Sequence, residues 1–265
     1  MISDRDIIQN IRDVEGFERY RRRLEGTINT ESTGRIGLMM YFLQGGRRHP
    51  LKARDAARAG GLTTRIVDDF LDGDGVKAVP DREEFLSRFR RSFREGEAAE
   101  ADKTVRKIAY RAGAIWGRYY LENSRRTHQD LLKVLKRAFD KVKDEDRSTP
   151  EGYERYLEGA GEEVGECMIR TLQPIEDYEV SQEKVEMGRN VAKLGLIADH
   201  IVDGDPAPEG KTLQEYYREA AEDVRKHRNP VLTALTYVNP KYMRPGAKLN
   251  MKIRQLISSK TNRLR

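Results

Sequence analysis

Two segments of the chain each place a pair of aspartates four residues apart among apolar residues. The first pair is Asp68 and Asp72, the second is Asp199 and Asp203, and each pair is followed by Gly-Asp. Residues four apart on a helix lie on one face, one turn above the other, so each pair presents two carboxylates in one direction. Carboxylates are preferred ligands of hard divalent cations, and Mg²⁺ commonly shares them with substrate phosphates. If the two helices face each other, the pattern predicts a four-carboxylate Mg²⁺ site.

A plainer interpretation of each pair is a solvated helix end followed by a glycine-containing turn. The apolar residues that flank the aspartates, among them Ile66, Phe70, Ile197 and Ile201, predict that both helices are largely buried. Carboxylates on buried helices are costly unless they are paired or bound to metal. The recurrence of the pattern therefore favours the metal interpretation over two coincidental helix ends.

Helical periodicity extends over most of the chain. It predicts helices over residues 2–24, 35–43, 51–72, 81–93, 98–123, 126–143, 148–172, 176–202, 212–226 and 246–259. No segment has the strict alternation of a half-buried β-strand, so the prediction is an all-α fold. The 51–72 helix contains Gly60, Gly61 and several alanines, and small side chains of this kind indicate a helix that lines a cavity.

The composition fits one helical domain over residues 1–265. The chain is 37% hydrophobic and 35% charged, which allows a sizeable core beneath well-solvated helix faces. Cys167 is the only cysteine, which excludes an internal disulfide framework and zinc-ribbon spacing. The sequence has neither a signal-peptide pattern nor a run of eighteen apolar residues, so a cytoplasmic protein is expected.

The net charge of +6 is concentrated near the end of the chain. Residues 224–265 contain no Asp or Glu but eleven Lys and Arg residues. This basic C-terminal segment could contact an anionic substrate or the surface of an anionic membrane, or it could be a solvated basic end. No nucleic-acid partner is expected, because the segment lacks interleaved aromatic residues and any recognised binding module.

Three blocks of sequence, in order, resemble the squalene and phytoene synthase family. Arg65-x-x-Asp68-Asp69-x-x-Asp72 is similar to the first aspartate-rich helix of these head-to-head prenyltransferases. The segment 156–166, which begins at a tyrosine and is rich in glycine, resembles the family's Y-C-x-x-V-A-G-x-V-G helix. The pair Asp199-x-x-x-Asp203 lies where the family has its second aspartate-rich motif. The resemblance covers residues 50–205.

The resemblance implies an isoprenoid-synthase-like helical bundle around a central apolar cavity. It implies Mg²⁺-dependent condensation of prenyl diphosphates, in which the diphosphate leaves and a carbocation reacts. The implied metal ligands are Asp68, Asp72, Asp199 and Asp203. Arg65 would bind phosphate oxygens.

The resemblance also suggests a role for Tyr156, whose ring would face the reacting carbons, where an aromatic π face can stabilise a cation. An ordinary core tyrosine with a hydrogen-bonded hydroxyl is the alternative for this residue. Asp69, next to the first pair, is either a fifth metal ligand or a charge on the helix surface.

The second motif departs from the family pattern. Where the family has Gln, Asn and Arg, this chain has Ala192, Gly195 and Ala198, which removes side chains expected to hold metal and diphosphate. The departures leave two alternatives to head-to-head condensation. One is a head-to-tail prenyl diphosphate synthase or terpene cyclase on the same fold, which needs fewer phosphate contacts. The other is a non-catalytic member that serves as a binding or assembly module.

Overall fold

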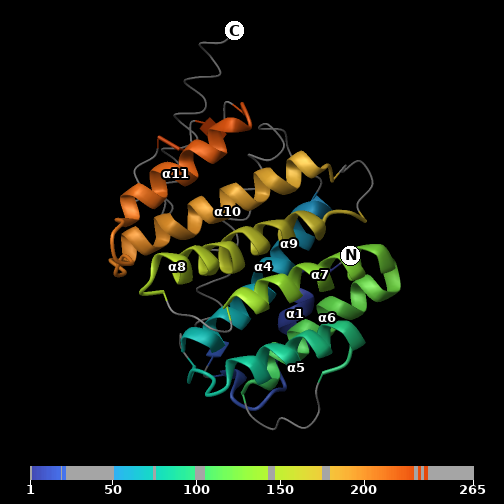
Figure 1. Cartoon of the computed structure of the whole chain (residues 1–265). Coiled ribbons are helices and arrows are strands. Elements are labelled where there is room, and N and C mark those ends of the chain that lie inside the picture. The colour runs from blue at the N-terminus through green and yellow to red at the C-terminus, as the bar shows by residue number, and fades with distance from the viewer. Residues whose placement is uncertain are drawn as a thin grey trace.

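The computed structural model contains helices and no strands over the residues that it describes, which confirms the all-α prediction (Figure 1). The described residues are 2–18, 20–21, 51–73 (side chains from 55 onward), 76–98, 105–142, 147–174, 180–229, 232–233 and 236–237. The predicted helices 35–43 and 246–259, and most of the basic C-terminal segment, lie outside these ranges. None of the described helices has the length and apolarity needed to cross a membrane.

The helices follow the predicted ranges closely after residue 50. Their bounds are α1 (Asp4–Ile11), α4 (Leu51–Asp72), α5 (Arg82–Glu95), α6 (Lys107–Asn123), α7 (Arg125–Val142), α8 (Pro150–Tyr156), α9 (Val164–Arg170), α10 (Gln182–Asp203) and α11 (Leu213–Lys226). A π-helical segment, η2 (Leu157–Glu163), joins α8 directly to α9. Side-chain caps fix several of these starts, such as Thr149 before Pro150 of α8 and Ser181 before α10.

The helix predicted over 176–202 begins only at Gln182, and two further predicted helices are wrong in extent. The continuous helix over residues 2–24 is interrupted, because α1 ends at Ile11 and Gly16 adopts a left-handed conformation with φ of 86°. The helix expected over 98–123 begins only at Lys107. The apolar spacing is present in both cases, but a turn lies within the first helix and before the second.

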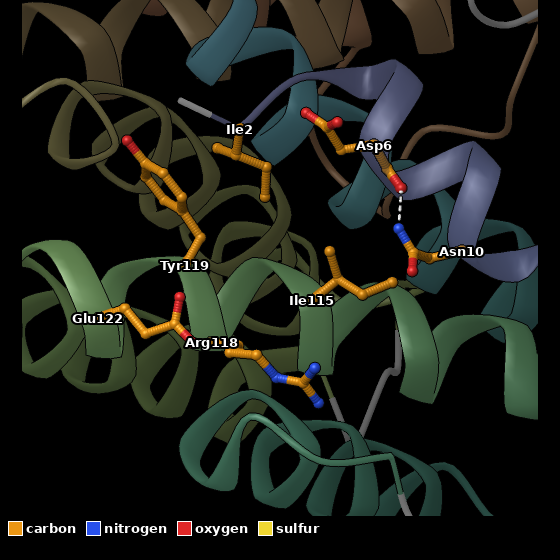
Figure 2. A pocket seen from close by; sticks show the side chains of 7 residues that line it. All are labelled: Ile2, Asp6, Asn10, Ile115, Arg118, Tyr119 and Glu122. Atoms are coloured by element: carbon orange, nitrogen blue, oxygen red, sulfur yellow. Dashed lines mark hydrogen bonds between the residues drawn. The ribbon is translucent and has the colours of Figure 1, made fainter.

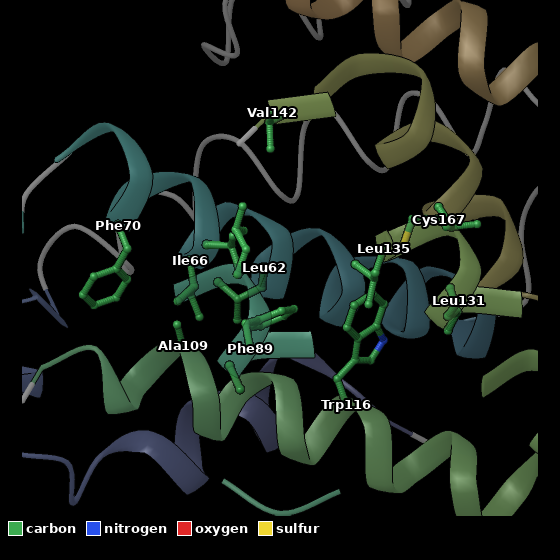
Figure 3. Close-up of a cluster of buried hydrophobic side chains, with 14 of the residues drawn as sticks. Leu62, Ile66, Phe70, Phe89, Ala109, Trp116, Leu131, Leu135, Val142 and Cys167 are labelled. Atoms are coloured by element: carbon green, nitrogen blue, oxygen red, sulfur yellow. The ribbon is translucent and has the colours of Figure 1, made fainter. Parts of the chain in front are cut away.

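The central helix of the bundle is α4, which packs against α1, α6 and α9. Its residues Leu62, Ile66 and Phe70 are fully buried (Figure 3), and the Phe70 ring packs against Phe85. Beyond this layer, α10 lies between α11 on one side and the η2–α9 helix on the other (Figure 1). The two aspartate-bearing helices therefore both contact α9, and both end near α8.

Close helix contacts explain some of the glycines. A Cβ on Gly165 of α9 would lie 2.3 Å from the carbonyl oxygen of Gly188 on α10. These two glycines let the α9 and α10 backbones approach each other. Near α4 the small residues have a different role. A Cβ on Gly60 would lie 3.1 Å from Thr171 and 3.3 Å from Trp116, closer than ordinary van der Waals contact, so the glycine accommodates these packed side chains.

Candidate functional site

The carboxylates at the end of α4 are surrounded by arginines. Nη1 of Arg65 donates to Oδ2 of Asp68 at 2.8 Å. Oδ1 of Asp72 lies 3.5 Å from Nη2 of Arg147 and 3.7 Å from Nη2 of Arg82. The two carboxylates are about one third exposed, so solvent reaches them. Cations from three separate segments thus offset the repulsion between the two aspartates.

The third aspartate of this helix faces the protein interior. Asp69 is fully buried, and it accepts a hydrogen bond from the hydroxyl of Tyr20. Its other oxygen lies 3.0 Å from Nε of Arg65. The hypothesis of a helix-surface charge is therefore wrong, and both carboxylate oxygens of Asp69 are engaged with protein groups. Asp69 holds the guanidinium group of Arg65 so that its far side reaches Asp68.

Asp72 and Asp203 are each the last residue of their helix. The glycine that follows each one closes the helix in a left-handed conformation, with φ of 82° and 76°. A negative charge at a helix C-terminus opposes the helix macrodipole, at a cost of about 0.3–1 kcal/mol. At α4 this cost is offset by Arg82, which also donates to the carbonyl of Leu71.

On α10, a buried histidine lies between the two aspartates. Asp199 is half-buried and Asp203 is exposed, whereas His200 is 6% exposed. Nδ1 of His200 is 2.8 Å from the hydroxyl of Tyr153, and its ring stacks on that of Tyr156 with centroids 5.6 Å apart. His200 is therefore a buried, hydrogen-bonded histidine whose two tyrosine partners both come from α8.

The stacked pair of Tyr156 and His200 connects the two aspartate motifs. The guanidinium of Arg147 lies over the Tyr156 ring, 3.7 Å from its centroid. Burial raises the pKa of Tyr156, Arg147 opposes this, and the negative charges of both α4 aspartates raise it further. Burial lowers the pKa of His200, and the charges of Asp205 and of both α10 aspartates act against that shift. Each motif is therefore close enough to act on one ring of the pair.

The four aspartates do not form one metal site. Among the residues with described positions, no group of three or more His, Cys, Asp or Glu side chains is arranged to hold a metal ion. Mg²⁺ typically takes one or two carboxylates and completes its shell with water and substrate phosphates, so a two-carboxylate site at Asp68 and Asp72 stays a prediction. The predicted sharing of metal between α4 and α10 is not seen in this arrangement.

Asp68 provides a pH-dependent prediction. Loss of hydration raises the pKa of Asp68 to about 7 although 38% of its side chain is exposed, with Arg65 opposing the shift and Asp72 and Asp69 adding to it. Because solvent screens this partly exposed carboxylate, the effect on stability is expected to be small. A raised carboxyl pKa stabilises the fold at pH values below the unfolded value, and this contribution is lost as pH rises through 7. The Asp68→Asn variant, which cannot ionise, should therefore gain thermal stability relative to wild type between pH 5 and pH 8. Unfolding midpoints measured with a chelator present test this, and a difference that stays constant with pH contradicts it.

A hollow of about 230 Å³ lies elsewhere, between α1 and α6. Figure 2 shows its lining, which is Ile2, Asp6, Asn10, Ile115, Arg118, Tyr119 and Glu122. None of the predicted site residues borders it. The central apolar cavity implied by the family resemblance stays a prediction.

Arg147, Tyr153 and His200 are the site residues that the sequence did not identify. Tyr153 carries a weak signal, since it lies one helical turn before Tyr156 on the same helix. Arg147 stands in a polar stretch before the helix start, where no periodicity marks it. Comparison with protein-family models, with curated proteins and with solved structures finds no match.

Proposed function

We propose that the chain is a Mg²⁺-dependent prenyltransferase that acts on allylic prenyl diphosphates. The observation that supports this best is that Arg147 joins Asp72 of α4 to the Tyr156 ring, which stacks on His200, the neighbour of Asp199 on α10. Arginines accompany the α4 carboxylates, and the site lies where α8 passes into η2. Short π-helical segments within α-helices are frequent at functional sites.

In this proposal, Asp68 and Asp72 hold Mg²⁺, which would neutralise negative charge as the diphosphate leaves. Arg65 is already positioned by Asp69, so its guanidinium needs little reorganisation to stabilise the leaving phosphate oxygens. The Tyr156 ring offers its π face to the allylic cation. Its burial, at 5% exposed, keeps water from that face of the site.

The test is incubation with Mg²⁺ and labelled C15 or C20 prenyl diphosphate, with and without isopentenyl diphosphate. The number of carbons in the product separates head-to-head condensation from chain elongation and cyclisation. Asp68→Ala should lower turnover by roughly 100-fold or more, the size of effect seen when one group that stabilises transition-state charge is removed. Asp140→Ala, an exposed aspartate on α7, is the matched control and should retain wild-type turnover.

A binding module without catalysis is the second candidate. It is favoured by the α10 motif, where Ala192, Gly195 and Ala198 supply no polar side chain and the aspartates do not join those of α4. If substrates from C10 to C20 bind but release no diphosphate, this second function replaces the first.

A further inference from the structure

Arg147 contacts both of the elements that form the candidate site. It lies before Thr149, the N-cap of α8, and it reaches the C-terminal end of α4. Its Nη2 is 3.5 Å from Oδ1 of Asp72, and its Cζ is 3.7 Å from the centre of the Tyr156 ring. One third of its side chain is exposed. A single guanidinium therefore lies between a carboxylate and a π face, and it remains open to solvent.

The ion pair between Arg147 and Asp72 is loose. Charge-assisted hydrogen bonds between guanidinium and carboxylate groups are usually 2.7–2.9 Å long, and the pair of Arg65 with Asp68 has such a length. The 3.5 Å separation at Arg147 is longer, and the same oxygen of Asp72 is also 3.7 Å from Arg82. Two guanidinium groups thus share one carboxylate oxygen, so Asp72 would still be paired with a cation if Arg147 moved away.

Two of the contacts of Arg147 match the two parts of an allylic diphosphate. A diphosphate presents negatively charged oxygens, which the planar fork of Arg binds well. A π face that already holds a guanidinium can equally hold the cation that forms at the other end of the substrate. If Arg147 moved onto the phosphate, both its place on Tyr156 and its share of Asp72 would become available.

We propose that Arg147 is a diphosphate-binding residue that exchanges its contacts with Asp72 and Tyr156 for phosphate oxygens when substrate binds. The inference rests on the proposed function for the identity of the substrate, but the exchange itself requires only a diphosphate group. No covalent bond forms or breaks in this step, because one ion pair replaces another. Asp72 keeps Arg82 as a partner and becomes available to a divalent cation.

The competing explanation is that Arg147 only fastens the start of α8 to the end of α4. In that case its replacement would lower stability and leave diphosphate affinity unchanged. Removal of a phosphate-binding guanidinium, by contrast, should lower the affinity for diphosphate while the protein remains folded.

The experiment is calorimetric titration of the full chain with inorganic pyrophosphate, with and without Mg²⁺. Arg147→Gln should weaken binding by at least about tenfold, which corresponds to about 1.4 kcal/mol. Arg147→Lys, which keeps the charge but loses the planar fork, should give an affinity between those of wild type and Arg147→Gln. The matched control is Arg126→Gln, which removes one exposed charge from the first turn of α7. Arg126 lies roughly 24 Å along α7 from Val142, which is the end of that helix nearer to Arg147 in the sequence. Its replacement should therefore change the affinity for pyrophosphate by no more than about twofold.

Unfolding midpoints of the same variants separate binding from folding. If Arg147→Gln does not fold, the Arg147→Lys titration decides the question. Wild-type affinity in a folded Arg147 variant overturns the inference, as does a wild-type chain that binds no pyrophosphate under either condition. If Arg147→Gln loses pyrophosphate binding but the wild-type protein consumes no prenyl diphosphate, the inference about Arg147 is supported and the proposed function is rejected. If Arg147→Gln turns over prenyl diphosphate as fast as wild type does, the proposed function is supported and the inference about Arg147 is overturned.

Discussion

Gly117→Ala should destabilise the fold by at least about 3 kcal/mol, as an added group does where packing cannot relax. Gly117 lies in α6 where that helix crosses α5, and a Cβ there would come within 1.8 Å of the Phe93 carbonyl oxygen. The neighbour cannot easily move. The Phe93 ring is fully buried against Trp116 and His128, and its carbonyl accepts a hydrogen bond from Nε2 of His128.

A second glycine in a helix interior serves as the control. A Cβ on Gly195 of α10 would meet no atom within 4 Å. Gly195→Ala should therefore stabilise the protein by about 1 kcal/mol, which is the difference in helix propensity between the two residues. Urea unfolding of both variants beside wild type measures the two effects. An unchanged midpoint for Gly117→Ala would mean that α5 and α6 are not packed as described.

Glu163→Gln should cost about 1.5–3 kcal/mol, the usual contribution of hydrogen bonds made to a charged group. Glu163 is 1% exposed and lies at the end of η2. Its carboxylate accepts from Arg137 at 2.9 Å and from Lys141 at 3.0 Å, and Arg189 of α10 lies 3.5 Å away. Replacing the carboxylate removes the one anion that all three cations share, although Arg137 keeps Glu166, Lys141 keeps Glu158 and Arg189 keeps Glu162. The substitution should therefore loosen the contact of η2 with α7 and α10.

Glu158 provides the matched control for this substitution. It lies in the same π-helical segment and also pairs with Lys141, at 3.1 Å, but it is about half exposed. Glu158→Gln should cost no more than about 1 kcal/mol, as for other exposed ion pairs. Thermal or urea unfolding at neutral pH tests the pair. If both substitutions lower the free energy of unfolding equally, the buried ion pairs of Glu163 are not what stabilises this region.

The same carboxylate contributes to acid unfolding. Burial alone would raise the pKa of Glu163, but hydrogen bonds and charges from Arg137 and Lys141 outweigh it and hold the pKa below its ordinary value. A lowered folded-state pKa gives stability that is present above the unfolded pKa and is lost as pH falls through the folded pKa. The stability deficit of Glu163→Gln relative to wild type should accordingly shrink as the pH is lowered.

Most of the fold could be predicted from the sequence, because the helices after residue 50 carry clear apolar stripes and explicit stop signals. The end of α10 is an example, where Gly204 follows Asp203 and closes the helix. The break at Gly16 was missed because its apolar neighbours keep helical spacing across the turn. A glycine within an amphipathic pattern does not by itself show whether it is tolerated or adopts positive φ.

The candidate site was only partly predictable, for a different physical reason. Spacing places Asp68 and Asp72 on one helix face, since that depends on local geometry alone. The direction in which Asp69 points depends on Tyr20, which is distant in sequence, and the position of Arg147 depends on how α8 packs near α4. Contacts between distant segments leave no periodic signal in a single sequence.

The wider winding of η2 has a consequence for how the chain can change. In an uninterrupted α-helix, Tyr156 and Glu163 would share one stripe, because seven residues make nearly two full turns. Here Tyr156 contacts Arg147 and His200, while Glu163 contacts cations on α7 and α10. Loss of one residue within this segment can be absorbed by a return to α-helical winding, whereas the same loss in α8 or α9 would rotate one half of the helix against the other. The segment is therefore the part of this helix where a change in length is easiest to accommodate.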